Sequence, residues 1–182
     1  AALEANLPCD ASAIWLLDDD TSIPIEERPL QLAAVKGVSK NKVLEVAQGS
    51  ISVRSFLNLG INNEQFTIRR PEDPYGPLGA SRKFKPNYSS LAVPLRSGDE
   101  ILGVLTLAHR KEGRYGSEAA AIATTLSSYA AVAIQNARLY TTAQEEAWSS
   151  TVLLQVAEAM QSINSVDSLL STSSSLGTMG KI

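Results

Sequence analysis

Short apolar runs bounded by turn-forming residues predict β-strands in the first half of the chain. Residues 12–17 form one run, which Asp18 closes, and residues 30–36 form a second, which ends at Gly37. A shorter strand is expected at 65–68. The acidic loop between the first two strands lacks the spacing of a calcium-binding loop, so it is interpreted as a solvated turn.

The strongest β-signal lies near the middle of the sequence. Leu91, Val93 and Leu95 alternate along one arm of a predicted β-hairpin, whose turn is 97–100 and whose second arm is 101–108. Pro94 has no backbone N–H for a strand ladder. An edge position or a bulge is therefore expected at that residue.

Elsewhere the spacing of apolar residues changes to three or four. Over residues 40–60 this spacing predicts two short helices, broken near Gly49 and closed by Gly60. Residues 70–87 contain four prolines and two glycines, which exclude a long regular element. A loop with one helical turn at 78–84 is expected there.

From Glu118 to Ile163 the sequence contains neither glycine nor proline, and its alanine-rich composition predicts one helix. Such a helix would be about 70 Å long at 1.5 Å per residue, more than a compact domain of this size needs, so most of it is expected to project. Steps of four and three residues along it give the 3.5-residue period of a coiled coil. The predicted dimer seam consists of Tyr129, Ala133, Asn136, Tyr140, Ala143, Ala147, Ser150, Leu154, Ala157 and Gln161.

An alternative for this helix remains open. It would pack back on its own domain as far as about Tyr140, and a separate helix would begin at 149–151.

The first residues of the chain lack both an initiator Met and the layout of a signal peptide, so they are interpreted as the cut end of a helix in a longer protein.

Composition excludes several classes of site. The 182 residues include one cysteine and one histidine, too few for a four-ligand zinc site, an intramolecular disulfide or a two-cysteine redox couple. The net charge is −3 and there is no long basic block, which argues against nucleic acid or an anionic membrane surface as the main partner. No apolar run is long enough to span a bilayer.

The order of these elements describes an α+β fold, a mostly antiparallel central sheet with helices on its faces and a long C-terminal exit helix. Within that order, residues 10–18 resemble the first strand of a GAF domain and 30–37 the second. Residues 90–95 and 101–107 are similar to the hairpin of that family, and 130–140 closely resemble its exit helix. The resemblance covers about residues 1–145 and implies a GAF/PAS-like fold.

The resemblance also implies a function. GAF domains are small-ligand sensors and dimerisation modules of histidine kinases, phosphatases and similar signalling proteins, so we expect a regulatory cytoplasmic module that is not an enzyme. Residues 1–140 would form the sensory domain, 141–163 a helical linker or coiled coil, and 164–182 a flexible tail or the truncated start of a following module. The implied partners are a second copy through the C-terminal helix and a downstream effector domain.

The chemistries known in the family fit these residues poorly. Asn63 to Phe66 lack the lysine of the cyclic-nucleotide signature. Cys9, the sole thiol, precedes the first strand and is expected to be a small buried apolar group. His109, the sole imidazole, ends the hairpin beside two cations, and a surface position is expected. Neither a metal nor another cofactor is therefore expected.

What remains is a ligand pocket, which the family forms between one sheet face and the segment before the hairpin, here Val53 to Tyr88. That segment has five of the ten aromatic residues and six cations against three carboxylates. Apolar walls with a few convergent donors suit a small anionic or aromatic molecule. The candidate ligand contacts are Arg54, Phe56, Phe66, Tyr75, Phe84 and Tyr88.

Alternatives remain open. For this segment, the aromatic residues would cap the core while the cations are solvated. For the whole chain, one alternative is a structural or dimerisation module that binds no ligand. The other is a catalytic derivative of the fold, which the missing cysteines and histidines disfavour.

Overall fold

The computed structural model describes residues 7–48, 51–57 and 66–177. The chain divides into two compact units, Ala1–Gln135 and Asn136–Ile182, and each is described by itself. The predicted N-terminal helix end, the helix break at Gly49 and the helix stop at Gly60 lie outside the described residues.

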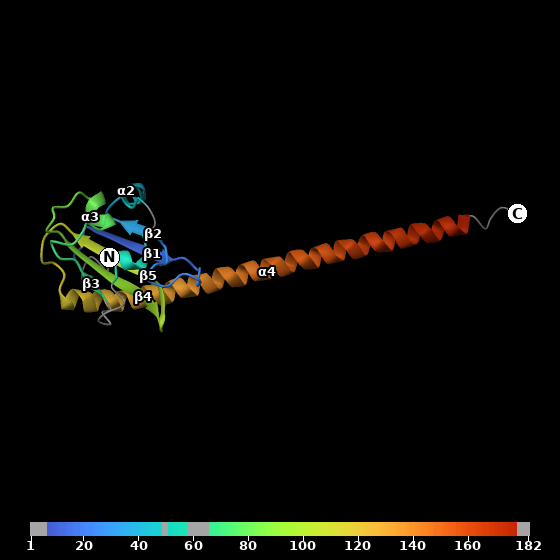
Figure 1. The fold of residues 1–182 in the computed structure, drawn as a ribbon. Helices are drawn as coiled ribbons and strands as arrows, with labels where there is room; N and C mark the ends of the chain where they lie inside the picture. The colour runs from blue at the N-terminus through green and yellow to red at the C-terminus, as the bar shows by residue number, and fades with distance from the viewer. Residues whose placement is uncertain (1–6, 49–50, 58–65, 178–182) are drawn as a thin grey trace. The chain divides into compact units, whose positions relative to one another are not determined.

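One antiparallel sheet of five strands forms the centre of the first unit, in the order β2-β1-β5-β4-β3 (Figure 1). All four neighbouring pairs are antiparallel, and the predicted fold class is confirmed. The strands are β1 Ala11–Leu17, β2 Leu30–Lys36, β3 Thr67–Ile68, β4 Ser89–Ser97 and β5 Glu100–His109.

Pro94 lies in β4, which is an inner strand of this sheet and not an edge. The described pairing of β3 with β4 is limited to Leu91 and Ala92, so that ladder stops before the proline. The register between β4 and β5 shifts after Leu95. A proline is tolerated here because the short β3 requires no donor from it and the ladder becomes irregular beside it.

Three short helices of the described residues cover one face of the sheet, with α2 and α3 visible above it in Figure 1. They are α2 Lys40–Val46, the 3₁₀ turn η1 Val53–Ser55 and α3 Pro77–Ser81. Ser39 caps α2 through a hydrogen bond from the Lys42 amide, and Pro77 starts α3, where its missing N–H costs nothing. The apolar side chains of these elements pack in one core with strands β1 and β2, a core that includes Val43, Val53, Leu78, Trp15 and Leu32.

The long helix α4, Ser117–Gly177, begins on the opposite face of the sheet (Figure 1). Its alanines in the first unit share a second core with the sheet, which includes Ala120, Ala123, Ala131, Leu91, Val93, Leu95 and Leu107. Small side chains let the helix approach the sheet closely, so both faces of the sheet are buried.

The helix continues beyond the predicted end at Ile163. Residues 164–177, expected as a flexible tail or the start of another module, are helical. The serine-rich composition suggested irregular structure, but the segment contains no glycine or proline until Gly177, where the helix ends. A separate helix does not begin at 149–151, because α4 runs through these residues without a break.

The seam predicted along α4 is exposed in the single chain. Tyr129 is 72% exposed, Tyr140 66% and Leu154 62%. The other seam residues with described side chains are also exposed, namely Ala133, Asn136, Ala143, Ala147 and Ala157. The side chains of Ser150 and Gln161 lie outside the described part of the helix. The two seam positions in the first unit, Tyr129 and Ala133, are therefore exposed, whereas the alanines that pack on the sheet are buried.

Candidate functional site

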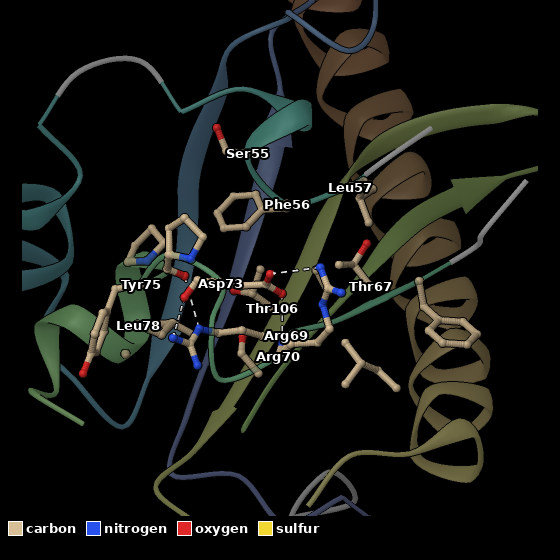
Figure 2. Close-up of a pocket in the computed structure, with 18 of the residues that line it drawn as sticks. Ser55, Phe56, Leu57, Thr67, Arg69, Arg70, Asp73, Tyr75, Leu78 and Thr106 are labelled. Atoms are coloured by element: carbon tan, nitrogen blue, oxygen red, sulfur yellow. Dashed lines mark hydrogen bonds and ion pairs between the residues drawn. The ribbon is translucent and has the colours of Figure 1, made fainter. Parts of the chain in front are cut away.

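A cavity of about 740 Å³ lies against the sheet face that carries the short helices (Figure 2). Its walls come from residues 54–57 around η1, residues 66–70 around β3 and residues 73–79 before and within α3. Ser90, Ala92 and Thr106 contribute from β4 and β5. The pocket thus forms in the region that the sequence predicted, between the sheet and the segment preceding the hairpin.

Four of the six predicted contact residues line this pocket, namely Arg54, Phe56, Phe66 and Tyr75. Phe84 and Tyr88 do not. Tyr88 is 2% exposed, and its Oη accepts a hydrogen bond from the Gly76 amide at 2.9 Å. Its ring centroid lies 5.7 Å from that of Phe84, so these two rings form a support behind the wall.

Gly79 explains why Tyr88 sits so deep. A Cβ at position 79 would overlap the ring and hydroxyl of Tyr88. The glycine in α3 therefore lets the ring pack directly on the helix backbone. Tyr88 was predicted to contact a ligand because the sequence shows that it is aromatic. The sequence does not show that α3 covers its ring.

The apolar side of the pocket is anchored in the sheet. The ring of Phe56 lies 5.3 Å from the ring of Trp15, whose indole N–H donates to Thr106 Oγ1 at 3.1 Å. The same hydroxyl is 3.5 Å from the carbonyl of Ala13, to which it donates. Thr106 is buried and its proton is used, so it helps shape the pocket more than it offers a donor to a ligand.

Arg69 is the main site residue that sequence reasoning missed. Its Nε donates to the carbonyl of Pro74, Nη2 to Asp73, and Nη1 to both Pro86 and Tyr88, at 2.7 to 3.2 Å. Its guanidinium thus binds four carbonyls within the chain. A usable signal existed, because a loop with four prolines has fewer N–H groups than carbonyls and needs donors from elsewhere.

Arg70 is also paired within the chain. Its backbone N–H donates to Asp73 Oδ2 at 2.9 Å, and its Nη2 lies 3.4 Å from Asp73 Oδ1. Nε lies 3.5 Å from Glu72. The backbone hydrogen bond from Arg70 is the main reason that the pKa of Asp73 is lowered, so this carboxylate stays charged and balances the arginine.

Arg54 is the pocket cation with the weakest pairing. Its Nη2 lies 3.8 Å from Glu27 Oε1, and both side chains are more than half exposed. Such an exposed pair contributes about 0–1 kcal/mol, so a ligand carboxylate or phosphate competes with Glu27 at small cost. The backbone N–H of Arg54 donates to the Glu26 carbonyl at 2.8 Å. This hydrogen bond fixes η1 and keeps Arg54 at the pocket wall.

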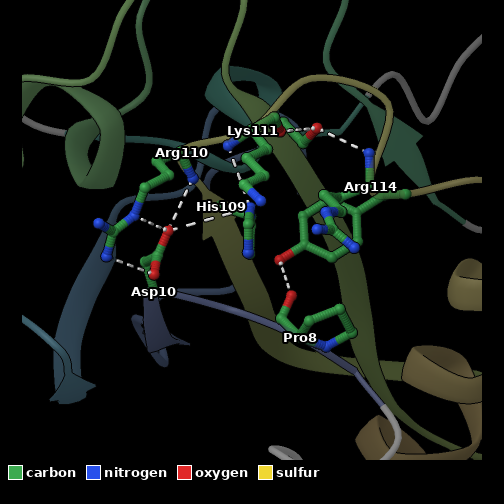
Figure 3. Close-up of polar contacts among 8 residues, drawn as sticks. Pro8, Asp10, His109, Arg110, Lys111 and Arg114 are labelled. Atoms are coloured by element: carbon green, nitrogen blue, oxygen red, sulfur yellow. Dashed lines mark hydrogen bonds and ion pairs between the residues drawn. The ribbon is translucent and has the colours of Figure 1, made fainter.

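His109 is not the surface residue that was predicted. Its side chain is 13% exposed, its Nδ1 accepts from the Lys111 amide at 3.0 Å and lies 3.9 Å from Asp10 Oδ2 (Figure 3). Burial lowers the pKa of His109 below its ordinary value. The expectation was wrong because Asp10 and the loop after β5 close over the strand end. Cys9 is half-buried and packs against the core beneath α4.

Neither His109 nor Cys9 lines the pocket. Within residues 7–48, 51–57 and 66–177, no group of three or more His, Cys, Asp and Glu side chains is arranged to hold a metal ion. A helix with the length and apolarity for crossing a bilayer is likewise not found in that part of the chain.

The family model described as GAF domain matches residues 1–135, which are also the residues of the first compact unit. This chain belongs to the GAF domain family. The resemblance identified in the sequence is thereby confirmed. No curated protein matches the chain in a sequence comparison.

Solved structures share the GAF domain fold of this chain. A domain described as part of a putative two-component sensor histidine kinase from Sinorhizobium meliloti 1021 has a TM-score of 0.55 and 16% identity, covering 79% of this chain and 90% of its own. A GAF domain/HD domain protein from Geobacter sulfurreducens gives 0.55 and 18%, covering 76% and 88%.

A third structure is the GAF domain of a phosphoenolpyruvate-protein phosphotransferase from Coxiella burnetii. Its TM-score is 0.51 and its identity 20%, and the match covers 77% of this chain and 80% of that one. At these identities the three similarities show a common fold, while ligand and partner of this GAF domain have to be inferred from its own residues.

Proposed function

We propose that this GAF domain is a regulatory module that binds a small anionic or aromatic molecule in the pocket beside β3. The supporting observation is the 740 Å³ cavity with a braced wall and a weakly paired arginine, Arg54. That volume is within the range of small-molecule sites. Phe56, Phe66 and Tyr75 supply apolar and aromatic surface, and Arg54 supplies the cation.

The alternative is a structural module that binds nothing. A core filled by its own side chains would favour it, whereas this structure has an open cavity in the ligand region. A catalytic role has less support. The described residues that line the cavity include neither histidine nor cysteine, so the usual pairing of a nucleophile with an imidazole base is missing there.

The proposal places the GAF domain in a multidomain signal-transduction protein, cytoplasmic, with a histidine kinase, phosphatase or similar effector downstream. Two copies would pair through the exposed seam of α4, including Tyr129, Tyr140 and Leu154. Ligand would act by binding one of two arrangements of the domain more tightly than the other, and the change would be transmitted as a small shift in the helix pair. The alanines of the seam bury little area per layer, so the isolated pair is expected to be weak.

Native mass spectrometry of freshly purified protein tests both parts, because bound mass and subunit number are read together. We expect a dimer with excess mass. A screen of small carboxylates, phosphates and aromatic acids by thermal shift then compares Arg54→Gln with Arg114→Gln, a matched loss of an exposed cation outside the pocket. Ligand stabilisation should fall only in Arg54→Gln.

Three results would each contradict a different part of this proposal. A bare mass in every charge state together with no thermal shift would support the structural module. Binding that is equally strong in Arg54→Gln and wild type would remove the role of Arg54 but leave the pocket in place. A monomer with bound ligand would contradict only the pairing of the helices.

A further inference from the structure

Charge is segregated between the two ends of the sheet in the first unit. In an antiparallel sheet β1 and β4 start at the end where β2 and β5 finish. That end, here called the basic end, exposes Lys36, Arg82, Lys83, Lys85, Lys111 and Arg114. The opposite end carries five carboxylates within residues 18–27, and two more in the hairpin turn at Asp99 and Glu100.

Two acidic groups at the basic end, Asp10 and Glu112, accept hydrogen bonds from within the chain. Asp10 accepts from the backbone N–H, Nε and Nη2 of Arg110 at 2.8, 3.0 and 2.9 Å (Figure 3). Glu112 Oε2 accepts a hydrogen bond from the side-chain Nδ2 of Asn87 at 3.2 Å. Arg110 balances the charge of Asp10, whereas Glu112 and the exposed Glu118 keep theirs. The six cations outnumber these two carboxylates and create a local positive potential on a molecule whose net charge is −3.

Hydrogen bonds fix the backbone that carries these cations. Arg82 Nη1 donates to the Gly37 carbonyl at 3.0 Å and joins the end of α3 to the end of β2. Ser89 Oγ donates to the Lys111 carbonyl at 2.7 Å and accepts from the Arg114 amide at 3.0 Å. A surface that is already ordered loses less conformational entropy when a partner binds.

Lys83 has an unusual backbone conformation at this surface. It has a φ of 53° and is the only described non-glycine residue with positive φ. It follows the C-cap Arg82 of α3, and the Lys83 and Phe84 amides donate to Ala80 and Gly79 as in a Schellman motif. Glycine is the usual residue at this position, so the lysine here carries a cost in backbone strain.

We propose that the basic end is a docking surface for an acidic segment of a protein partner, whose Asp and Glu carboxylates pair with Lys83, Lys85, Lys111 and Arg114. This inference goes beyond the small-molecule site and does not require the pocket to be occupied. A nucleic acid is the less suitable polyanion. Of the rings near these cations, Phe84, Tyr88 and Tyr115 are buried or half-buried. Tyr75, whose Oη donates to the Phe84 carbonyl, is 45% exposed, so one ring of this group is open to base stacking, fewer than the series of aromatic rings on which successive bases stack in single-strand binding proteins.

The test uses the full 182-residue chain and a short fluorescent peptide of alternating glutamate and serine, followed by anisotropy at low salt. We expect saturable binding that weakens as salt is added and is lost when glutamine replaces glutamate in the peptide. Lys83→Gly combined with Lys111→Gln should lower the affinity about three- to tenfold. Lys83→Gly relieves strain, so this loss would not reflect unfolding.

The control variant, Thr142→Glu combined with Gln144→Glu, gives the chain the same net charge through exposed positions of α4. It should bind the peptide like wild type. Equal weakening in both variants would show a response to total charge and overturn the proposal, as would wild type that does not bind. Tighter binding of a single-stranded oligonucleotide, lost in the Lys83 and Lys111 variant, would replace the acidic protein by nucleic acid.

Discussion

The guanidinium of Arg69 lies 4.1 Å from the ring centroid of Tyr88 while its Nη1 donates to the carbonyl of that same residue at 3.2 Å. Arg69 precedes the proline-rich loop and Tyr88 follows it, so one side chain joins the two ends of the loop. The loop forms a wall of the pocket, and this contact explains how a segment with little regular structure keeps a defined shape.

Arg69→Lys is expected to destabilise the GAF domain by about 1–3 kcal/mol. A lysine keeps the charge, but its single ammonium cannot reach four carbonyls in a fork and stack on Tyr88 at once. Urea unfolding gives the free-energy change, and hydrogen exchange should show faster exchange over residues 70–88. Arg70→Gln is the matched control, because its exposed ion pairs contribute about 0–1 kcal/mol. Equal losses in the two variants would contradict the bracing role of Arg69.

Gly79→Ala should destabilise the GAF domain by about 1–3 kcal/mol, since the added methyl overlaps the buried Tyr88 ring and α3 has to move. Gly116→Ala is the comparison, because a Cβ there meets nothing within 4 Å. Thermal unfolding of the two variants is the measurement. If Gly79→Ala unfolds like wild type, the packing of Tyr88 on the α3 backbone is not what the structure indicates.

Periodicity located the strands and helices well because burial on a two-faced sheet constrains each residue. β1 alternates between fully and partly buried positions, and Ala13, Trp15 and Leu17 all face the same core. The hairpin was equally clear, since both of its strands are inner strands, β5 is almost continuously apolar and β4 is apolar from Leu91 to Leu95. The serine-rich composition did not indicate the helix over 164–177, where the lack of a helix breaker mattered more than the serine content.

The site was predicted less completely, because its residues act through tertiary contacts. Phe56 and Tyr75 were found as aromatic side chains in the expected segment, and both line the cavity. Arg69 looked like any other loop cation, since its four acceptors are main-chain carbonyls that no residue type reveals. His109 was misplaced for a similar reason: Asp10, which lies beside it, is distant in the sequence.

Asp10→Asn is expected to cost about 1–2 kcal/mol of stability at neutral pH, because it removes a charged acceptor for several hydrogen bonds. Hydrogen bonds from the Arg110 side chain lower the pKa of Asp10 from 3.8 to about 2. A carboxyl whose pKa is lower in the folded state stabilises the fold above its unfolded pKa, and this contribution is lost as the pH falls from 3.8 toward 2. Urea unfolding at several pH values should show the wild-type advantage disappear in that window. A constant difference would contradict this linkage.

His109 should make stability fall as the pH drops below 6.5. Burial lowers its pKa in the folded state, with Arg114, Arg110 and Lys111 acting in the same direction and Asp10 opposing them. The unfolded chain then binds a proton first, which favours unfolding below pH 6.5. His109→Asn keeps an acceptor for the Lys111 amide but does not titrate. Its melting temperature should therefore vary less with pH than that of wild type from neutral pH to mildly acidic pH.

Lys83→Gly is expected to raise the stability of the GAF domain by about 0.5–1 kcal/mol. Left-handed backbone costs a side-chain-bearing residue about 1–2 kcal/mol, and part of that gain is offset because glycine makes the unfolded chain more flexible. Lys85→Gly removes the same charge where φ is not positive, so only the flexibility term remains and stability should fall. Opposite signs in urea unfolding would identify backbone strain at Lys83, whereas a loss of stability in both variants would show that its side chain contributes more to the fold than its backbone costs.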